Sequence, residues 1–288
     1  MRLFLLVALT MIAFAANSVL NRMALAGGGI DAIAFGAIRL VAGAVMLGAL
    51  CLLLRGKMRL GSAHRAAGVG ALLLYLFGFS YAYEALDAGL GALVLFGMVQ
   101  ITMFAGGLIA GEAMPPRRWI GAVLAMAGLI WLLLPGGSAQ VSLLHGGAMA
   151  IAGVGWGLYS LAGRRAGDAL QDTGANFVIA ALICALPGLW MGEIATGGPG
   201  IEGVLLAVIC GAVTSGLGYA LWYSVLPRLQ ASVAAVAQLT VPVIAMAGGM
   251  VFLGEVLTLQ FALASVLVLG GVAVSVLGYS RTRTSRGS

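Results

Sequence analysis

Polar and aromatic side chains recur at intervals within stretches of the chain that are otherwise apolar. Aromatic rings, a methionine and aliphatic neighbours can form a mainly apolar wall, while Asn, Gln and Ser offer neutral hydrogen-bonding groups. Such a wall suits a solute that carries a bulky apolar group on a small polar head. By their depth in these stretches, the candidate solute-binding residues are Phe14, Asn17, Tyr75, Phe79, Met98, Gln100, Trp156, Tyr159, Ser215, Tyr219, Gln238 and Pro242.

Each of these residues also has a purely structural interpretation. Tyr, Trp and Met in membrane helices commonly serve packing or the aromatic belt at the lipid interface. The tryptophans nearer the ends of their stretches are assigned to that belt: Trp131, Trp190 and Trp222. The buried amides could bond between helices instead of binding a solute, a contribution of roughly 1 kcal/mol each.

Arg39 is the most informative charge, because it lies about 12 Å inside its apolar stretch at a helical rise of about 1.5 Å per residue. A central arginine costs about 2.5–3.5 kcal/mol on insertion scales, so a partner or a wet cavity is expected. Glu84, near the end of the third stretch, is the expected partner. We predict that Arg39 and Glu84 act as structural or gating charges. A multiply phosphorylated solute would need several basic groups, and Arg39 is alone.

Residue patterns for catalysis or metal binding are absent from the sequence. Cys51, Cys184 and Cys210 are isolated in apolar stretches and form neither a CxxC motif nor a metal set. There is no HExxH or GxSxG motif, and the Gly-x-Gly-x-Gly at 153–157 follows no strand. We therefore expect no enzyme activity, no cofactor and no metal.

Ion coupling is left open by the sequence. All nine acidic residues fall at or near the ends of the apolar stretches, and His64 and His145 lie in or beside connections. Two ways of driving solute movement are compatible with the sequence. One is facilitated movement down the solute gradient, and the other is proton coupling through Glu84 or Glu112.

The elements that must position these groups are membrane helices. The chain is 62% hydrophobic and 8% charged, against about 25% charged residues in soluble domains. Stretches of about 20 apolar residues match a hydrocarbon core roughly 30 Å thick. Ten such stretches are expected at 3–26, 31–54, 64–86, 90–111, 117–134, 142–164, 173–192, 202–226, 230–253 and 259–280.

The positive charges alternate from one connection to the next. Lys and Arg are found in the even-numbered connections and at both ends of the chain, whereas the odd-numbered connections have none. By the positive-inside rule, both termini are cytoplasmic. The net charge of +6 is then a matter of topology, and no nucleic-acid partner is expected. The predicted location is the bacterial inner (plasma) membrane.

The second half of the chain repeats the first. Phe14 and Trp156 are related by an offset of 142 residues, and the pairs Gly111-Glu112 and Gly254-Glu255 by 143. An odd number of five spans per half forces the second copy to enter the membrane from the opposite face. We expect two inverted five-helix units, at 1–138 and 139–288. Because the first stretch has a partner in the second half, it is expected to be retained rather than cleaved as a signal peptide.

These features resemble the drug/metabolite transporter superfamily and, within it, the ten-helix EamA-type exporters. The resemblance rests on the 5+5 repeat, the Gly-Glu pairs, Arg39 in Ala-Ile-Arg-Leu and Pro242 in Gln-Leu-Thr-Val-Pro, and it is strongest to bacterial exporters of aromatic amino acids. The family often has a proline in both halves, and the position matching Pro242 is Val99.

The resemblance implies a secondary transporter that exports amino acids and related metabolites, bulky or aromatic ones with some breadth, by alternating access. The alternatives are an exporter of nucleosides, purines or drugs, or a non-transporting membrane receptor or assembly subunit. The expected partners are a small-molecule substrate and the lipid bilayer. Protons and the oligomeric state stay open, and a monomer is compatible with the sequence.

Overall fold

The chain is helical wherever its structure is described. A computed structural model describes residues 1–62, 64–111, 115–134, 142–163, 167–185, 199–229 and 237–277, and it has no strand in these ranges. The elements are α1 (Arg2–Ala26), α2 (Ala32–Arg55), α3 (Arg65–Ala82), α4 (Ala88–Ile109), α5 (Pro116–Leu133), α6 (Leu143–Gly163), α7 (Ala169–Cys184), α9 (Ile201–Ile209), the π-helix η2 (Cys210–Leu217), α10 (Gly218–Val225), the 3₁₀ turn η3 (Leu226–Arg228), α12 (Thr240–Leu253) and α13 (Leu259–Leu277).

Local signals in the sequence place several helix ends. Asp31 caps α2 by accepting hydrogen bonds from the amides of Ile33 and Ala34, and Asp168 caps α7 in the same way. Gly56 and Gly254 end α2 and α12 with φ of 68° and 66°, a left-handed conformation that glycine adopts without strain. These caps set where α2 and α12 stop and the connections start.

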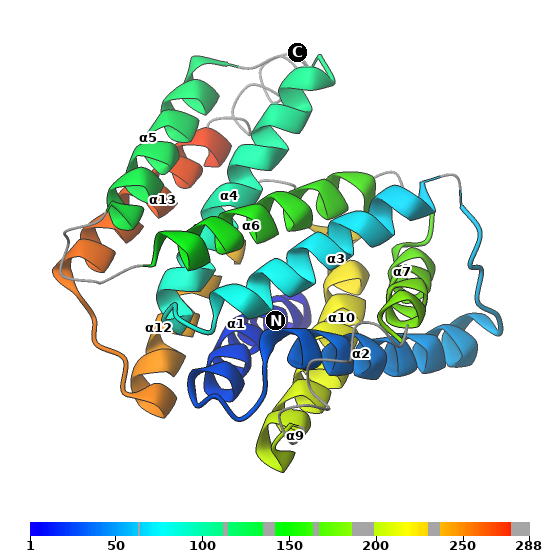
Figure 1. The fold of residues 1–288 in the computed structure, drawn as a ribbon. Helices are drawn as coiled ribbons and strands as arrows, with labels where there is room; N and C mark the ends of the chain where they lie inside the picture. The colour runs from blue at the N-terminus through cyan, green and yellow to red at the C-terminus, as the bar shows by residue number, and fades with distance from the viewer. Residues whose placement is uncertain are drawn as a thin grey trace, which may run out of the picture.

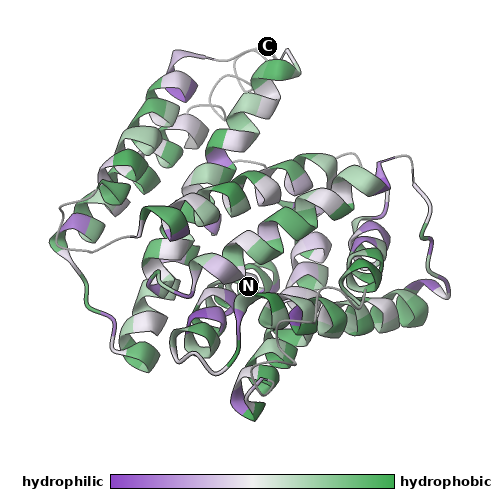
Figure 2. Cartoon of the chain, viewed as in Figure 1, coloured by the Kyte–Doolittle hydropathy of each residue, from purple (hydrophilic) through white to green (hydrophobic). Residues whose placement is uncertain are grey.

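The exterior of the bundle is apolar. By length and hydropathy, six helical segments in the described ranges could cross a membrane: α1 to α5 and the continuous rod α9–η2–α10. Shorter apolar helices are found at α7, α12 and α13. Large side chains such as Val45, Leu53 and Val251 stay exposed on these surfaces, and the hydrophilic residues gather at helix ends and connections (Figure 2). The expectation of an all-α membrane protein is confirmed, because only lipid makes such an exterior favourable.

The helices pack in pairs that are distant in sequence (Figure 1). α3 lies along α6, α5 lies along α13, and α7 packs against α2, while α4 contacts both α6 and α12. α1 packs on α12 and on the rod that contains η2. The centre of the bundle is therefore built by α1, α3, α4, α6 and η2–α10.

Glycines let the central helices approach closely. A Cβ at Gly155 of α6 would lie 2.7 Å from the backbone nitrogen of Tyr75 in α3, and a Cβ at Gly153 would lie 2.6 Å from the Cβ of Met98 in α4. Small residues at such contacts bring helix backbones together in membranes. α6 is thereby held against α3 and α4, and Trp156 projects among their side chains.

We name the two ends of the bundle by their connections. The basic face carries the connection between α2 and α3, with Arg55, Lys57 and Arg59, together with the start of α7 and the end of α10. The opposite face carries the connections between α1 and α2, between α3 and α4, and between α12 and α13.

Candidate functional site: a central aromatic cavity

Aromatic side chains from four helices meet at the centre of the bundle and form an aromatic cluster. The ring centroids of Trp156 lie 4.9 Å from Tyr75, 5.0 Å from Tyr219 and 6.4 Å from Phe14. Phe79 lies 5.3 Å from Tyr75. These distances suit tilted and edge-on aromatic contacts, which add to the stabilisation from burial. The cluster surrounds a small cavity lined by Phe14, Asn17, Ser18, Tyr75, Phe79, Leu95, Phe96, Trp156 and Tyr219.

The hydroxyl of Tyr75 joins four elements in one hydrogen-bond network. It accepts from Asn17 Nδ2 at 3.2 Å and from Arg39 Nη2 at 3.0 Å, and it lies 3.2 Å from the Tyr219 hydroxyl. All four side chains are buried. Because buried polar groups need partners, this network holds α1, α2, α3 and α10 in register around the cavity.

A π-helical segment supplies further polar groups to the same network. η2 places Cys210 and Thr214 beside Asn17, whose Oδ1 accepts from Cys210 Sγ at 2.8 Å and from Thr214 Oγ1 at 3.3 Å. Ser215 of η2 faces α2 and accepts from Arg39 Nε at 3.1 Å. π-helical turns are rare and occur frequently at functional sites.

The predicted pairing of Arg39 with Glu84 is wrong. Arg39 is fully buried and bonds to Tyr75 and Ser215, both neutral. Glu84 is exposed at the opposite face, where its Oε1 accepts from the Ala32 amide at 3.3 Å and its Oε2 lies 4.0 Å from His145 Nε2. The two side chains are separated because Arg39 lies about two turns inside α2, while Glu84 follows the end of α3.

The central cavity is closed in this conformation. The space among its lining residues has room for about one water molecule. A solute the size of an amino acid could enter only after the surrounding helices separate. The aromatic cluster is therefore a packed core here, and any binding site at this place belongs to a second arrangement of the same helices.

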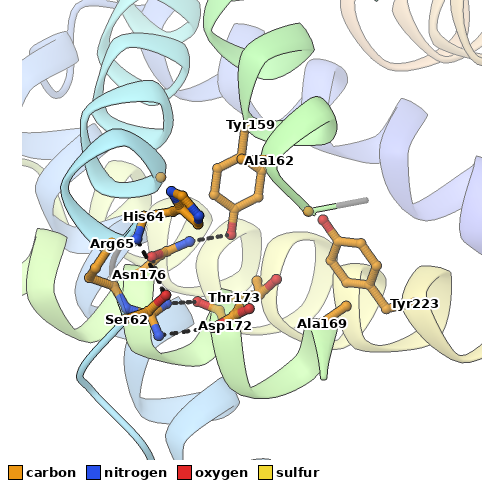
Figure 3. A pocket seen from close by; sticks show the side chains of 12 residues that line it. Ser62, His64, Arg65, Tyr159, Ala162, Ala169, Asp172, Thr173, Asn176 and Tyr223 are labelled. Atoms are coloured by element: carbon orange, nitrogen blue, oxygen red, sulfur yellow. Dashed lines mark hydrogen bonds and ion pairs between the residues drawn. The ribbon is translucent and has the colours of Figure 1, made fainter. Parts of the chain in front are cut away.

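A polar pocket opens at the basic face (Figure 3). It holds about 40 Å³ of space, enough for a few water molecules, and is partly open to solvent. Tyr159 lines it and stacks on Trp156 with 5.6 Å between ring centroids and 20° between ring planes. The Tyr159 hydroxyl accepts from Asn176 Nδ2 at 3.2 Å. Trp156 lines the central cavity and Tyr159 lines the polar pocket, so this stacked pair lies between the two spaces.

An ion pair and a hydrogen bond to an amide hold the walls of the polar pocket. Arg65 Nη2 pairs with Asp172 Oδ1 at 2.9 Å, and Arg65 Nη1 donates to Asn176 Oδ1 at 2.9 Å (Figure 3). Nearby, Arg55 Nε donates to Asp168 Oδ2 at 2.7 Å. Burial alone would raise the pKa of Asp168, but the hydrogen bonds from Arg55 and from the amides of α7 dominate and hold it below its ordinary value. The connection between α2 and α3 is thereby fastened to the start of α7.

The opposite face is sealed by bonds among helix ends. Arg22 of α1 donates to the carbonyls of Tyr83 and Glu84 at 3.0 and 2.9 Å. Glu255, just after α12, accepts from the Ala88 amide at the start of α4 at 2.7 Å. Burial raises the pKa of Glu255 above its ordinary value, even though this hydrogen bond favours the charged form. Glu112, its expected counterpart, lies outside the described residues.

The structure brings some of the predicted residues to the cavity and leaves others away from it. Six line it: Phe14, Asn17, Tyr75, Phe79, Trp156 and Tyr219. Ser215 accepts a hydrogen bond from Arg39, and Tyr159 lines the polar pocket. Four predicted residues are not among those that line the cavity: Met98, which packs against Gly153, and Gln100, Gln238 and Pro242.

Selecting residues by their depth in the apolar stretches missed three residues that line the cavity. Leu95 lies one helical turn before Met98. Phe96 follows Leu95 in sequence, and Ser18 follows Asn17. The helical period identifies such neighbours only when the inward face is known. Trp222 was also misassigned to the interface belt, because it is 5% exposed and lies 5.8 Å from Phe14. Trp190 lies outside the described residues.

Comparison with known proteins identifies this architecture. The EamA-like transporter family matches residues 1–134 and 147–277. The chain belongs to the EamA-like transporter family. The resemblance seen in the sequence is thus confirmed, and the protein is a multi-pass membrane transporter.

Relatives of this EamA protein include both uncharacterized and named proteins. It is 46% identical to an uncharacterized protein of Pseudomonas aeruginosa over 95% of this chain and 94% of that one. It is 26% identical to a probable amino-acid metabolite efflux pump of Salmonella typhimurium, covering 70% and 71% of the two chains. A threonine/homoserine exporter of Escherichia coli, RhtA, is 32% identical over 58% of this chain and 56% of its own. A crystal structure 23% identical in sequence has a TM-score of 0.62, covering 93% of this chain and 97% of the other, which supports the fold.

Proposed function

We propose that this transporter exports amino acids and related metabolites, with bulky or aromatic ones preferred, through the central cavity by alternating access. The observation that supports the proposal most strongly is the aromatic cluster, which surrounds a cavity that neutral polar groups also line. The cluster lies between the polar pocket at the basic face and the bonded helix ends at the opposite face. Exporters of amino acids or their metabolites among the relatives support the substrate class.

The proposal requires ten membrane crossings in two inverted units of five, at residues 1–138 and 139–288. Helix packing supports it, because contacts occur in reciprocal pairs. α4 packs on α6 as α12 packs on α1, and α3 packs on α7 as the rod α9–η2–α10 packs on α2. α5 packs on α13, its own counterpart. A two-fold relation between the halves produces such reciprocity.

In this cycle the described conformation is closed at the opposite face and accessible at the basic face. Substrate enters the polar pocket and moves past Trp156 and Tyr159 into the cavity as α6 shifts relative to α3. Release follows when the bonds of Arg22 and Glu255 at the opposite face break. The glycine contacts of α6 with α3 and α4 support such sliding, since small residues leave few interlocking side chains.

The lining residues support a substrate with one large apolar group. Phe14, Trp156 and Tyr219 offer aromatic faces, while Asn17 and Tyr75 offer neutral hydrogen bonds. The same aromatic faces would also stack on a purine or nucleoside, which makes that class the second candidate.

Counterflow in proteoliposomes tests the function. Purified protein is reconstituted, and exchange of labelled phenylalanine, threonine and a nucleoside is measured with and without a pH gradient. We expect saturable exchange of phenylalanine or threonine. Exchange of the nucleoside alone would assign the second candidate, and no saturable flux for any solute would favour a receptor or assembly subunit.

Single-cysteine labelling tests the orientation. With both termini cytoplasmic, the basic face is internal, so Gly61→Cys should react with an impermeant maleimide only after the cells are opened. Gly29→Cys, at the opposite face, should react in intact cells. Both glycines are exposed and have open space around the Cα. Labelling of both from one side would reject this arrangement.

A further inference from the structure

Among the residues that the structure describes, the groups that hold Arg39 at the centre of the bundle are neutral. Its Nε donates to Ser215 and its Nη2 to Tyr75, and its guanidinium carbon lies 5.5 Å from the Tyr75 ring centroid and 5.1 Å from that of Phe79. The side chain is 0% exposed. Nη1 has no hydrogen-bond partner.

This arrangement leaves a positive charge without an anion. In the part of the chain that the structure describes, no carboxylate forms an ion pair with Arg39. Hydrogen bonds to hydroxyls and contacts with aromatic faces compensate a buried guanidinium only in part. A charge in the interior of a membrane protein marks a functional site when no partner in the protein neutralises it.

The neighbours of Arg39 connect it to the cavity. Tyr75 and Phe79 both line the central cavity and both lie against the guanidinium. A solute seated among the aromatic rings would therefore be one side chain away from Arg39. When the helices separate, its anionic group could accept from Nη1 without displacing any bond that Arg39 now makes.

We propose that Arg39 is the binding subsite for a single carboxylate of the transported solute. The inference rests on the proposed function and names its substrate class more narrowly, as monocarboxylates with a bulky apolar group, among them zwitterionic amino acids. A guanidinium matches a carboxylate in shape, and the match is bidentate when two N–H groups are available. One arginine serves one carboxylate, whereas nucleosides and organic cations have no anionic group that would neutralise its charge.

A role in structure alone is the competing explanation, because Arg39 also ties α2 to α3 and η2. The two roles differ in selectivity. A structural tie affects all solutes equally, whereas a carboxylate subsite distinguishes an acid from its amide. The test must therefore compare pairs of solutes that differ only at the carboxylate.

The experiment measures counterflow of labelled phenylalanine, or of whichever amino acid exchanges fastest, in proteoliposomes. Unlabelled phenylalanine, phenylalaninamide and phenethylamine compete. For the unmodified protein, we expect the two analogues without a carboxylate to compete at least about tenfold more weakly, because a charged hydrogen bond is lost. If all three solutes compete equally for the unmodified protein, the carboxylate subsite is overturned, and no variant is needed to reach that result.

Variants assign the effect to Arg39. Arg39→Gln should remove the preference for the acid over the amide, and Arg39→Lys should keep part of it. Arg59→Gln, which removes one exposed arginine outside both the cavity and the polar pocket, is the matched control and should keep the full preference. Folding is checked by the melting temperature in detergent, and phenylalanine should raise the melting temperature of the unmodified protein and of Arg59→Gln but not of Arg39→Gln.

The outcomes separate this inference from the proposed function. Transport by the unmodified protein together with an unchanged preference in Arg39→Gln would overturn the carboxylate subsite alone. If Arg39→Gln does not fold, the carboxylate subsite is tested by the competition data for the unmodified protein and by the preference that Arg39→Lys keeps. A lack of saturable exchange for every amino acid would overturn both the proposed function and the subsite.

Discussion

Arg65 in the polar pocket and Arg39 beside the central cavity are both largely hidden from solvent, yet their partners differ in charge. Arg65 is bonded to the carboxylate and carbonyl of Asp172, to Asn176 and to the carbonyl of Leu60. Arg39 is bonded to two hydroxyls and has one nitrogen without a partner. Both arginines join helices, but a carboxylate neutralises only Arg65, and the proposed carboxylate subsite requires this difference at Arg39. The residue type alone does not reveal it.

Truncation of Trp156, which lies between the central cavity and the polar pocket, is expected to have the largest effect on stability. Trp156 belongs to the central cluster and stacks on Tyr159 of the polar pocket, so Trp156→Ala would merge the two spaces. We expect a loss of about 3–5 kcal/mol in the free energy of unfolding, as for other large core truncations. Denaturant unfolding in detergent micelles measures it. Trp156→Phe, which keeps a ring, should lose less, and equal stability of Trp156→Ala and the unmodified protein would contradict the packed cluster.

Two glycines test whether the contact between α2 and η2 is packed more rigidly than the polar pocket. A Cβ at Gly211 of η2 would clash with the backbone oxygen of Arg39, whereas a Cβ at Gly68 would meet the side-chain amide of Asn176 at 2.9 Å. A side chain can rotate away and a helix backbone cannot. Gly211→Ala should therefore destabilise the fold by about 1–3 kcal/mol, and Gly68→Ala by less. The two melting temperatures measure the effect, and a larger loss for Gly68→Ala would show that the polar pocket is the more rigid region.

Replacing each arginine by methionine tests whether Arg65 and Arg39 contribute differently to the stability of the fold. Arg65→Met breaks an ion pair in which Asp172 keeps some contact with solvent, so a loss of about 1–2 kcal/mol is expected. Arg39→Met removes a buried charge for which the described part of the chain supplies no counterion, and a neutral or stabilising change is expected. Unfolding curves of both variants provide the measurement. Destabilisation of the same size in both would mean that Arg39 is a structural tie like Arg65.

The smallest expected effect is a pH dependence at the sealed face. Burial raises the pKa of Glu255, so the folded protein binds a proton more tightly than the unfolded chain does. Stability contributed by this group is then greatest below its ordinary pKa of 4.5 and falls as the pH rises through the raised value. Melting temperatures from pH 4 upward should show this decline in the unmodified protein and a weaker one in Glu255→Gln. Identical profiles would exclude Glu255 as the source.

The sequence predicted the helices better than it predicted the contacts. The all-helical membrane class, the family and most of the cavity-lining aromatics follow from apolar stretches, an internal repeat and depth in the membrane. Gln100, Gln238 and Pro242 have suitable depth but are not among the cavity-lining residues, because depth does not specify which side of a helix faces inward.

The membrane class was determined by the sequence itself, since insertion depends on the hydropathy of consecutive residues and is a local property. The partners of Arg39, the burial of Trp222 and the closed state of the cavity were decided only by the tertiary structure. They depend on how α2, α3, η2 and α10 are rotated against one another, and that rotation results from glycine contacts and hydrogen bonds between residues far apart in the chain.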